Sequence, residues 1–230
     1  MGQLTVVAPR EEQSTRGHAV TFRDAVAVEW IEHELFGRTC VVAGYPADCT
    51  RIGLAAGQGK FDWIVSGVNH GGNLGVDAFY SGTVAGAREG ALHGYPAIAV
   101  SQLYRPDTPA DWSRTVEWTR RVIEEVVHRP RAEYTFWNVN LPALESALHP
   151  ARVRTVRLSI DAVPVTYEVS SDGAPNRERY LYKGTYYERA AAPGTDVEAV
   201  FDGDIAVTPI RIDATCLTHE DAEYPFRGDG

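Results

Sequence analysis

Residues 61–75, FDWIVSGVNHGGNLG, decide the fold and carry the densest group of candidate functional residues. The first six, Phe61–Ser66, form a compact apolar run of the kind that becomes a buried strand. A glycine-rich loop over 67–82 follows, and its two asparagines offer neutral oxygen ligands to a hard cation. In an open parallel sheet, ligands bind where strands end. The stretch therefore predicts a strand that leads into a binding loop, although a tight loop with asparagine in turn positions is the simpler interpretation of the spacing alone.

Strand-like and helical patterns alternate along the first 141 residues. The strand-like runs are Leu4–Ala8, Cys40–Ala43, Pro96–Ser101 and Glu133–Asn140. The helical patterns are Ala47–Ala56, Thr83–Leu92 and Asp107–His128. This alternation predicts a three-layer α/β fold with a mainly parallel sheet.

After Leu141 the pattern changes to strand-like runs with few long helices. These runs are Val153–Ser159, Val163–Val169, Arg179–Tyr182 and Ile205–Ile212. We therefore expect a single domain with an α/β core over 1–141, a β-rich arm over 142–204, and a returning strand and tail over 205–230. The tyrosines at 180, 182, 186 and 187 suit an arm interface, or stacking on a base.

Composition excludes several classes of protein. The 230 residues carry a formal net charge of −9, which argues against a protein that coats a nucleic-acid polymer but permits one bound nucleotide. No apolar run approaches the ~20 residues that span a membrane, and the start does not resemble a signal peptide, so we expect a cytoplasmic protein. Three cysteines, Cys40, Cys49 and Cys216, form no CxxC motif and are interpreted as structural thiols.

Two further segments carry candidate binding residues. Ser81, Gly82 and Thr83 open a helix whose free N–H groups favour an anion, although Ser81 as a simple helix cap is the plainer interpretation. The polar loop over 9–18 offers the Ser14 hydroxyl to a metal or phosphate, and Arg16 or His18 to a phosphate or base. A polar loop of this kind is usually just solvated.

His70 lies beside Asn69 and is a weak candidate for proton transfer or leaving-group contact. A histidine next to a glycine loop more often serves in packing or hydrogen bonding.

Together these segments resemble the SurE (stationary-phase survival protein) family of 5′/3′-nucleotidases and acid phosphatases. The similar segments, in order, are Val6–Pro9 with Ser14, Gly44–Cys49 (GYPADC), Ser66–Gly75, Tyr80–Ala85 (YSGTVA), Pro193–Asp196 (PGTD) and Val207–Ile210 (VTPI). They recur from about residue 4 to 212.

The resemblance implies a Rossmann-like core, a protruding arm, and a homodimer or homotetramer with exchanged C-terminal segments. It also implies a hydrolase that removes phosphate from nucleoside monophosphates with a divalent metal such as Mn²⁺ or Mg²⁺. By position, Ser14 and Asn69 are similar to two metal ligands of the family. Asn73, Ser81, Gly82 and Thr83 are the expected phosphate contacts.

The sequence also departs from the family pattern. Family members open with a strand that ends in Asn-Asp-Asp-Gly, whose aspartates are the remaining metal ligands, and no Asp-Asp pair occurs here. A smaller departure is Val76-Asp77, where the family often has two aspartates. Two neutral ligands should hold a hard divalent cation poorly, and the missing strand would lie inside the sheet. We therefore expect a truncated start of the gene, with a non-catalytic nucleotide- or phosphate-binding relative as the alternative.

Overall fold

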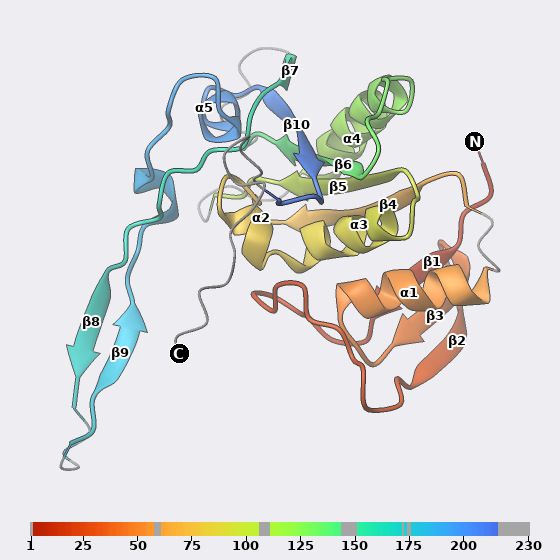
Figure 1. Cartoon of the computed structure of the whole chain (residues 1–230), viewed down its shortest axis with the longest axis horizontal. Helices are drawn as coiled ribbons and strands as arrows, with labels where there is room; N and C mark the ends of the chain where they lie inside the picture. Colours follow the sequence, from red (N-terminus) through yellow and green to blue (C-terminus); the bar gives the residue numbers. More distant parts are fainter. Residues whose placement is uncertain are drawn as a thin grey trace, which may run out of the picture.

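The computed structural model describes residues 2–57, 61–105, 111–143, 151–171, 173 and 176–215. Its central sheet has five strands, and helices cover both faces (Figure 1). In order across the sheet, the strands are β4 (Ile64–His70), β5 (Ala97–Gln102), β6 (Thr135–Leu141), β10 (Ile205–Arg211) and β7 (Val153–Thr155). β4, β5 and β6 run parallel, whereas β10 is antiparallel to β6. The predicted three-layer, mainly parallel α/β fold is confirmed.

Strand β5 is buried on both faces because its alternate residues pack into two different helical layers. Ile98 and Val100 join the core under α4 (Trp112–Val126), and Ala97 and Ala99 join the core under α3 (Gly82–Leu92). Successive side chains of a strand point to opposite faces, so a continuous apolar run serves both cores. The alanines on the α3 side allow a close helix–sheet approach.

A second, three-stranded sheet in the order β1-β3-β2 comes from the first part of the chain. Its elements are β1 (Val6–Pro9), β2 (Val28–His33) and β3 (Gly37–Val42), followed by α1 (Pro46–Ala56). β1 and β3 run parallel, and Cys40, Val42 and Cys49 form a small core between β3 and α1. Both cysteines are free thiols, and burial raises the pKa of Cys49 to about 12, as a structural role requires. Cys216 lies outside the described residues.

The two sheets present unpaired edges at β1 and β4. Within the described residues, β1 pairs only with β3, and β4 pairs only with β5. Helix α1 packs on β1, α3 packs on β4, and the two helices pack on each other. Helices on one face of a sheet lie about 10 Å apart, roughly twice the ~4.8 Å spacing of paired strands. From this general spacing we infer that the two edges are separated by about the width of one strand. Val65 on β4 is 50% exposed.

The predicted glycine-rich loop over 67–82 was placed too early. Strand β4 continues to His70, so Asn69 and His70 lie on the strand, and the short helix α2 (Asp77–Tyr80) occupies the later part of the expected loop. The register of β4 against β5 shifts between Ser66 and Asn69. This irregularity lets the strand continue through Gly67, although the glycine-rich sequence predicted a loop there.

The arm is an antiparallel hairpin of β8 (Tyr167–Ser170) and β9 (Arg179–Tyr182), which projects from the body of the molecule (Figure 1). Tyr180 and Tyr182 lie on this hairpin and make edge contacts with Tyr167. The other two tyrosines of the predicted cluster lie at the root of the arm, in and around the short 3-10 helix Tyr186–Glu188, and pack against the core near α5 (Asp196–Phe201). The predicted division into core, arm and returning strand stays a prediction.

The root of the arm is bonded to the segment that follows β4. The Arg189 guanidinium, which is almost fully buried, donates to the Asp77 carboxylate at 2.7 Å and to the backbone oxygen of Leu74 at 3.1 Å. It also lies 4.0 Å from the centre of the Tyr186 ring. The arm root therefore fixes where residues 74–77 lie.

Asp196 makes a second connection between the same two regions. Its carboxylate accepts hydrogen bonds from the backbone N–H groups of Gly75 (2.8 Å), Ser159 (2.9 Å) and Val197 (3.0 Å). The side chain is fully buried. Two acceptor oxygens shared among three donors satisfy backbone groups that would otherwise be buried without a partner.

Glu89 on α3 binds the loop between β1 and β2. Its buried carboxylate contacts His18 Nε2 at 2.8 Å, Arg51 Nε at 2.7 Å and His93 Nε2 at 3.2 Å. Burial acts to raise the pKa of Glu89, but the hydrogen bonds from His18 and Arg51 outweigh it, and the pKa falls below the ordinary 4.5. The charged carboxylate therefore holds α3, α1 and the loop together.

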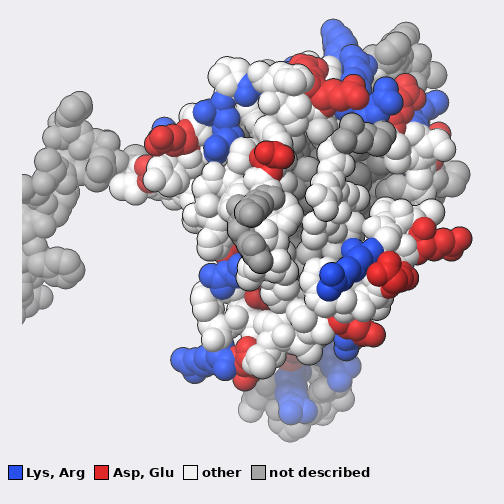
Figure 2. All heavy atoms as spheres, turned by 90° about the vertical axis from the view of Figure 1, so that its right-hand side faces the viewer, with Lys and Arg blue, Asp and Glu red and all other residues white. Residues whose placement is uncertain are grey.

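The surface carries charges of both signs. Figure 2 shows basic and acidic side chains interspersed on one face, with no large field of a single sign. None of the helices in the described part of the chain has the length and apolar character needed to cross a bilayer.

Replacing Glu89 by glutamine should destabilise the fold at pH 7 by about 1–3 kcal/mol, because charge-assisted bonds to His18 and Arg51 are lost. A carboxylate with a lowered pKa stabilises the folded state above its ordinary pKa, and this contribution disappears as pH falls through the lowered value. The difference in the free energy of unfolding between the unchanged protein and Glu89→Gln, measured in urea, should therefore be largest at pH 6–7 and should disappear at acid pH. Glu124→Gln, which removes an exposed pair with Arg120, is the matched control and should have little effect. A gap that persists unchanged at acid pH would contradict the role of the charge.

Replacing Asp196 by asparagine should cost about 1–3 kcal/mol, because one acceptor oxygen becomes an NH₂ group, which faces either the Gly75 N–H or the Ser159 and Val197 N–H groups and cannot accept from them. The measurement is the free energy of unfolding, with the exposed Asp202→Asn as control. Equal stability of the two variants would show that the carboxylate oxygens of Asp196 are not needed.

Candidate functional site

The candidate site lies at the carboxyl ends of β4 and β5. Asn69, near the end of β4, pairs with Ser101 of β5, and its Nδ2 donates to the backbone oxygen of Gly71 at 2.8 Å. This bond leaves the amide oxygen of Asn69 available as an acceptor or ligand. The predicted neutral donor is therefore near the carboxyl end of a parallel strand, where ligands bind in this type of fold.

Asn73 is buried and held by three polar side chains from the ends of β5 and β6. Its Nδ2 donates to Ser101 Oγ at 2.7 Å, and its backbone N–H donates to Asn140 Oδ1 at 2.8 Å. Its backbone oxygen accepts from Asn138 and Asn140 at 2.9 and 3.1 Å. The structure thus gives Asn73 a supporting position under the loop. Its predicted phosphate contact stays a prediction.

Ser81 caps α3, because its Oγ accepts from the Val84 N–H at 3.1 Å. This is the plainer of the two interpretations of the segment, and it is compatible with the other. The N–H groups of Gly82 and Thr83, in the first turn of an 11-residue helix, have no partner within the helix. They are the groups through which a helix start binds an anion.

The loop after β1 lies against the start of α3. The Gly17 N–H donates to the Tyr80 backbone oxygen at 3.0 Å. A Cβ placed on Gly82 would lie 3.6 Å from the Gln13 backbone oxygen and 3.0 Å from Pro46 Cγ. The tertiary structure therefore brings the Ser14 loop, the first turn of α3 and the start of α1 together.

Within that loop the three predicted residues differ. The Ser14 hydroxyl donates to the Glu12 carboxylate at 2.6 Å, and Arg16 is exposed. His18 faces Glu89 through Nε2, while Nδ1 lies 3.4 Å from Arg88 Nη1. His18 is thus committed to the contact that holds the loop, and its predicted role at a phosphate or base stays a prediction.

His70 ends β4 in an aromatic cluster. Its ring centre lies 4.2 Å from that of Tyr104 and 6.1 Å from that of Trp112. Sequence reasoning missed both partners. The sequence offered one sign of these contacts: Tyr104 and Trp112 are aromatic residues in the segment that follows β5.

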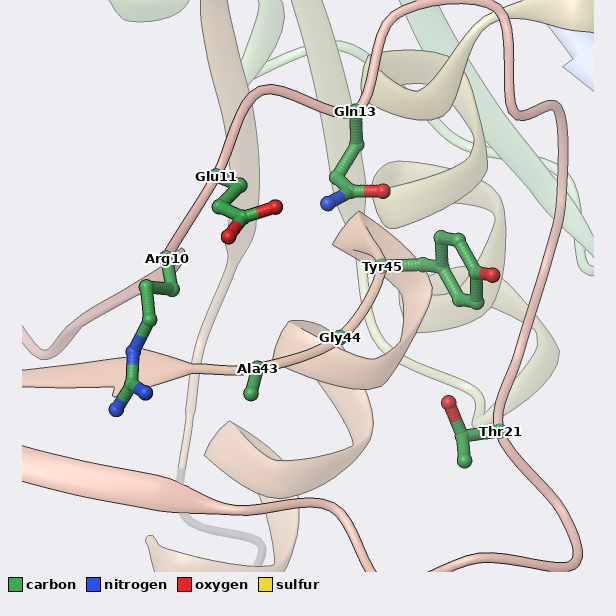
Figure 3. Close-up of a pocket in the computed structure, with 7 residues that line it drawn as sticks. All are labelled: Arg10, Glu11, Gln13, Thr21, Ala43, Gly44 and Tyr45. Carbon is green, nitrogen blue, oxygen red and sulfur yellow. The ribbon is translucent and has the colours of Figure 1, made fainter.

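A pocket of about 280 Å³ lies beside the Ser14 loop, at the carboxyl ends of β1 and β3 (Figure 3). Its lining residues are Arg10, Glu11, Gln13, Thr21, Ala43, Gly44 and Tyr45. Asp48 holds two of these lining residues in place, since its carboxylate accepts from the Thr21 N–H (2.9 Å), the Thr21 hydroxyl (2.9 Å) and the Tyr45 N–H (3.0 Å). Sequence reasoning did not find this pocket, because it depends on the packing of two loops.

The described residues do not by themselves fit a divalent cation. Ser14 and Asn69 are neutral ligands, and nowhere in the described ranges do three His, Cys, Asp or Glu residues gather closely enough to hold a metal. Hard divalent cations favour carboxylate oxygens. The donors present are therefore part of a metal site at most.

Comparison with known proteins identifies the family. The family model described as "Survival protein SurE" matches residues 1–162. The chain is 36% identical over 228 residues to the 5′-nucleotidase SurE of Paramagnetospirillum magneticum, covering 94% of this chain and 80% of that protein. It is 36% identical over 217 residues to the 5′-nucleotidase SurE of Gloeobacter violaceus, covering 92% and 80%.

The fold agrees with this result. The crystal structure of SurE protein from Aquifex aeolicus matches with a TM-score of 0.78 and 31% identity, over 94% of this chain and 85% of that one. The family match, the sequence identities and the fold therefore agree. This chain belongs to the SurE family.

Proposed function

We propose that this protein is a phosphoric monoester hydrolase that converts nucleoside monophosphates to nucleoside and inorganic phosphate. Family membership and relatives named 5′-nucleotidase support this function. The structural observation that carries it is the meeting of the Ser14 loop with the first turn of α3 at the sheet edge where β4 ends.

The phosphate is proposed to bind at the start of α3. The N–H groups of Gly82 and Thr83 are directed out of the helix start, and the helix dipole favours an anion there. Arg16, exposed on the facing loop, adds a positive charge that can approach the phosphate. Asn73 and Ser81 complete the proposed set of phosphate contacts, with His18 at its edge.

Hydrolysis then needs little covalent chemistry from the protein. Water attacks phosphorus in line with the departing nucleoside oxygen, and backbone N–H groups aimed at the phosphoryl oxygens stabilise the charge that develops. His70 lies on the same strand end as Asn69 and is proposed to contact the leaving nucleoside.

We propose Mn²⁺ or Mg²⁺ as the cofactor, with Ser14 and Asn69 as neutral ligands. The carboxylates would come from an additional strand between β1 and β4, and two observations support it. The edges of β1 and β4 are unpaired within the described residues, and the cation donors lie at or after the ends of these same strands. A strand there would pair with both edges and end beside both donors.

We also propose a homodimer or homotetramer. The arm hairpin supports this, since Val169, Tyr180 and Leu181 are all more than half exposed on a projecting ribbon. A two-stranded hairpin is marginal alone in water, and contact with another subunit would stabilise it. The alternative function, a nucleotide-binding relative without catalysis, has no support among the comparisons.

The 230-residue chain should show no hydrolysis of p-nitrophenyl phosphate or nucleoside monophosphates that depends on Mn²⁺. Joining a β-strand that ends in two adjacent aspartates ahead of Gly2 should create Mn²⁺-dependent, EDTA-sensitive turnover, because carboxylates then complete the ligand set. The control strand carries asparagine at both aspartate positions. EDTA-sensitive turnover by the 230-residue chain itself would overturn the account, because other carboxylates would then hold the metal.

In the protein that carries the aspartate strand, Asn69→Ala should lower kcat/KM for nucleoside monophosphates by roughly 100-fold or more, a loss typical of removing one group that stabilises the transition state. Asn176→Gly on the distant arm is the control, because its backbone already has a left-handed φ of 60° that glycine accepts. Undiminished activity of the Asn69 variant would eliminate this residue from the site.

A further inference from the structure

Three aromatic rings meet at the end of β4, the strand that also carries Asn69, and each ring comes from a different segment. His70 ends β4, Tyr104 follows β5 by two residues, and Trp112 opens α4. The ring centres of His70 and Tyr104 are 4.2 Å apart with planes inclined at 44°, and those of His70 and Trp112 are 6.1 Å apart at 36°. The cluster is thus built by tertiary structure at the ligand-binding edge of the sheet.

The cluster is open to solvent on one side. Trp112 is 50% exposed, and His70 is also exposed. In contrast, the other apolar residues on the sheet-facing side of α4, Trp118, Val122 and Val126, are buried in the core. Packing of α4 on the sheet therefore does not depend on the indole of Trp112, which leaves its faces accessible to a flat ligand.

The cluster is also held in place from behind. The Tyr187 hydroxyl donates to the backbone oxygen of Tyr104, and the Arg105 guanidinium lies 4.8 Å from the centre of the Tyr187 ring. Tyr187 belongs to the arm root, so core and arm together set the position of Tyr104. A preset aromatic surface loses little conformational entropy when it binds a ligand.

The position of the cluster fits the leaving group of the proposed reaction. Asn69 directly precedes His70, and the Asn73 Nδ2 bond to Ser101 supports the same strand ends. In a nucleoside monophosphate, a single ribose separates the phosphate from the base. Asn69 and His70 are adjacent at the strand end, so we infer that the base of a nucleotide whose phosphate is bound near Asn69 extends past the strand end toward the rings.

We propose that Trp112, with His70 and Tyr104, forms the stacking site for the nucleobase of the substrate. This inference rests on the proposed nucleotidase function and names the part of the substrate that the protein selects. Bases of every kind present a π-face to aromatic side chains, so the site discriminates nucleotides from sugar phosphates more than one base from another.

Two matched substrates test this site. In the protein with the completed metal site, Trp112→Ala should lower kcat/KM for 5′-AMP by roughly 10- to 100-fold, in line with the loss of one stacked base. Hydrolysis of ribose 5-phosphate, which has the same phosphoester and no base, should be unchanged. Trp112→Phe should restore most of the activity on 5′-AMP. Equal losses for both substrates, or no loss for either, would overturn the proposal.

A binding measurement on the 230-residue chain separates this proposal from the proposed reaction. Adenosine, which has no phosphate, should quench the tryptophan fluorescence, and Trp112→Phe should remove that quenching. Trp30→Phe is the control: Trp30 is 39% exposed, lies on the outermost strand β2 of the other sheet, and should leave the quenching unchanged. Quenching through Trp112, combined with no turnover by the protein that carries the aspartate strand, would uphold the stacking site and reject the nucleotidase function. Quenching that survives Trp112→Phe, or no quenching at all, would reject the stacking site.

Discussion

The site depends on one buried set of hydrogen bonds, between Asn73 and the polar carboxyl ends of β5 and β6. Ser101, Asn138 and Asn140 lie at positions that are fully inaccessible to solvent, where an unpartnered amide or hydroxyl is costly. These three side chains form hydrogen bonds with the side chain and backbone of Asn73, and the bonds fix the position of the loop. The loop then has one position, and everything that follows β4 is placed relative to it.

A second layer of contacts extends this order outward. The arm root clamps residues 74–77 through Arg189 and Asp196, and Glu89 clamps the Ser14 loop to α3. Both clamps place a charged group in a buried environment and satisfy it with several donors, which makes each of them specific in geometry. The candidate site therefore lies between two loops, and the charged residues that anchor them are not themselves candidate ligands.

The unpaired edges at β1 and β4 connect fold and chemistry. A sheet edge carries free N–H and C=O groups that favour pairing with another strand. Here two such edges flank the region where Ser14 and Asn69 offer only neutral oxygens. The neutral ligand types and the two unpaired edges therefore both favour the proposed additional strand that carries carboxylates.

The sequence by itself determined the α/β class, most strands and helices, and Ser81 as the cap of α3, because apolar periodicity and helix-start chemistry are local properties. It misplaced the end of β4, since a strand that continues through glycine looks like a loop in one dimension. Only the tertiary structure decided that His18 serves Glu89 and that Tyr186 belongs to the arm root rather than to the hairpin. It alone brought Tyr104 and Trp112 to His70, because contacts between residues distant in the chain depend on how the layers pack, and no local pattern records them.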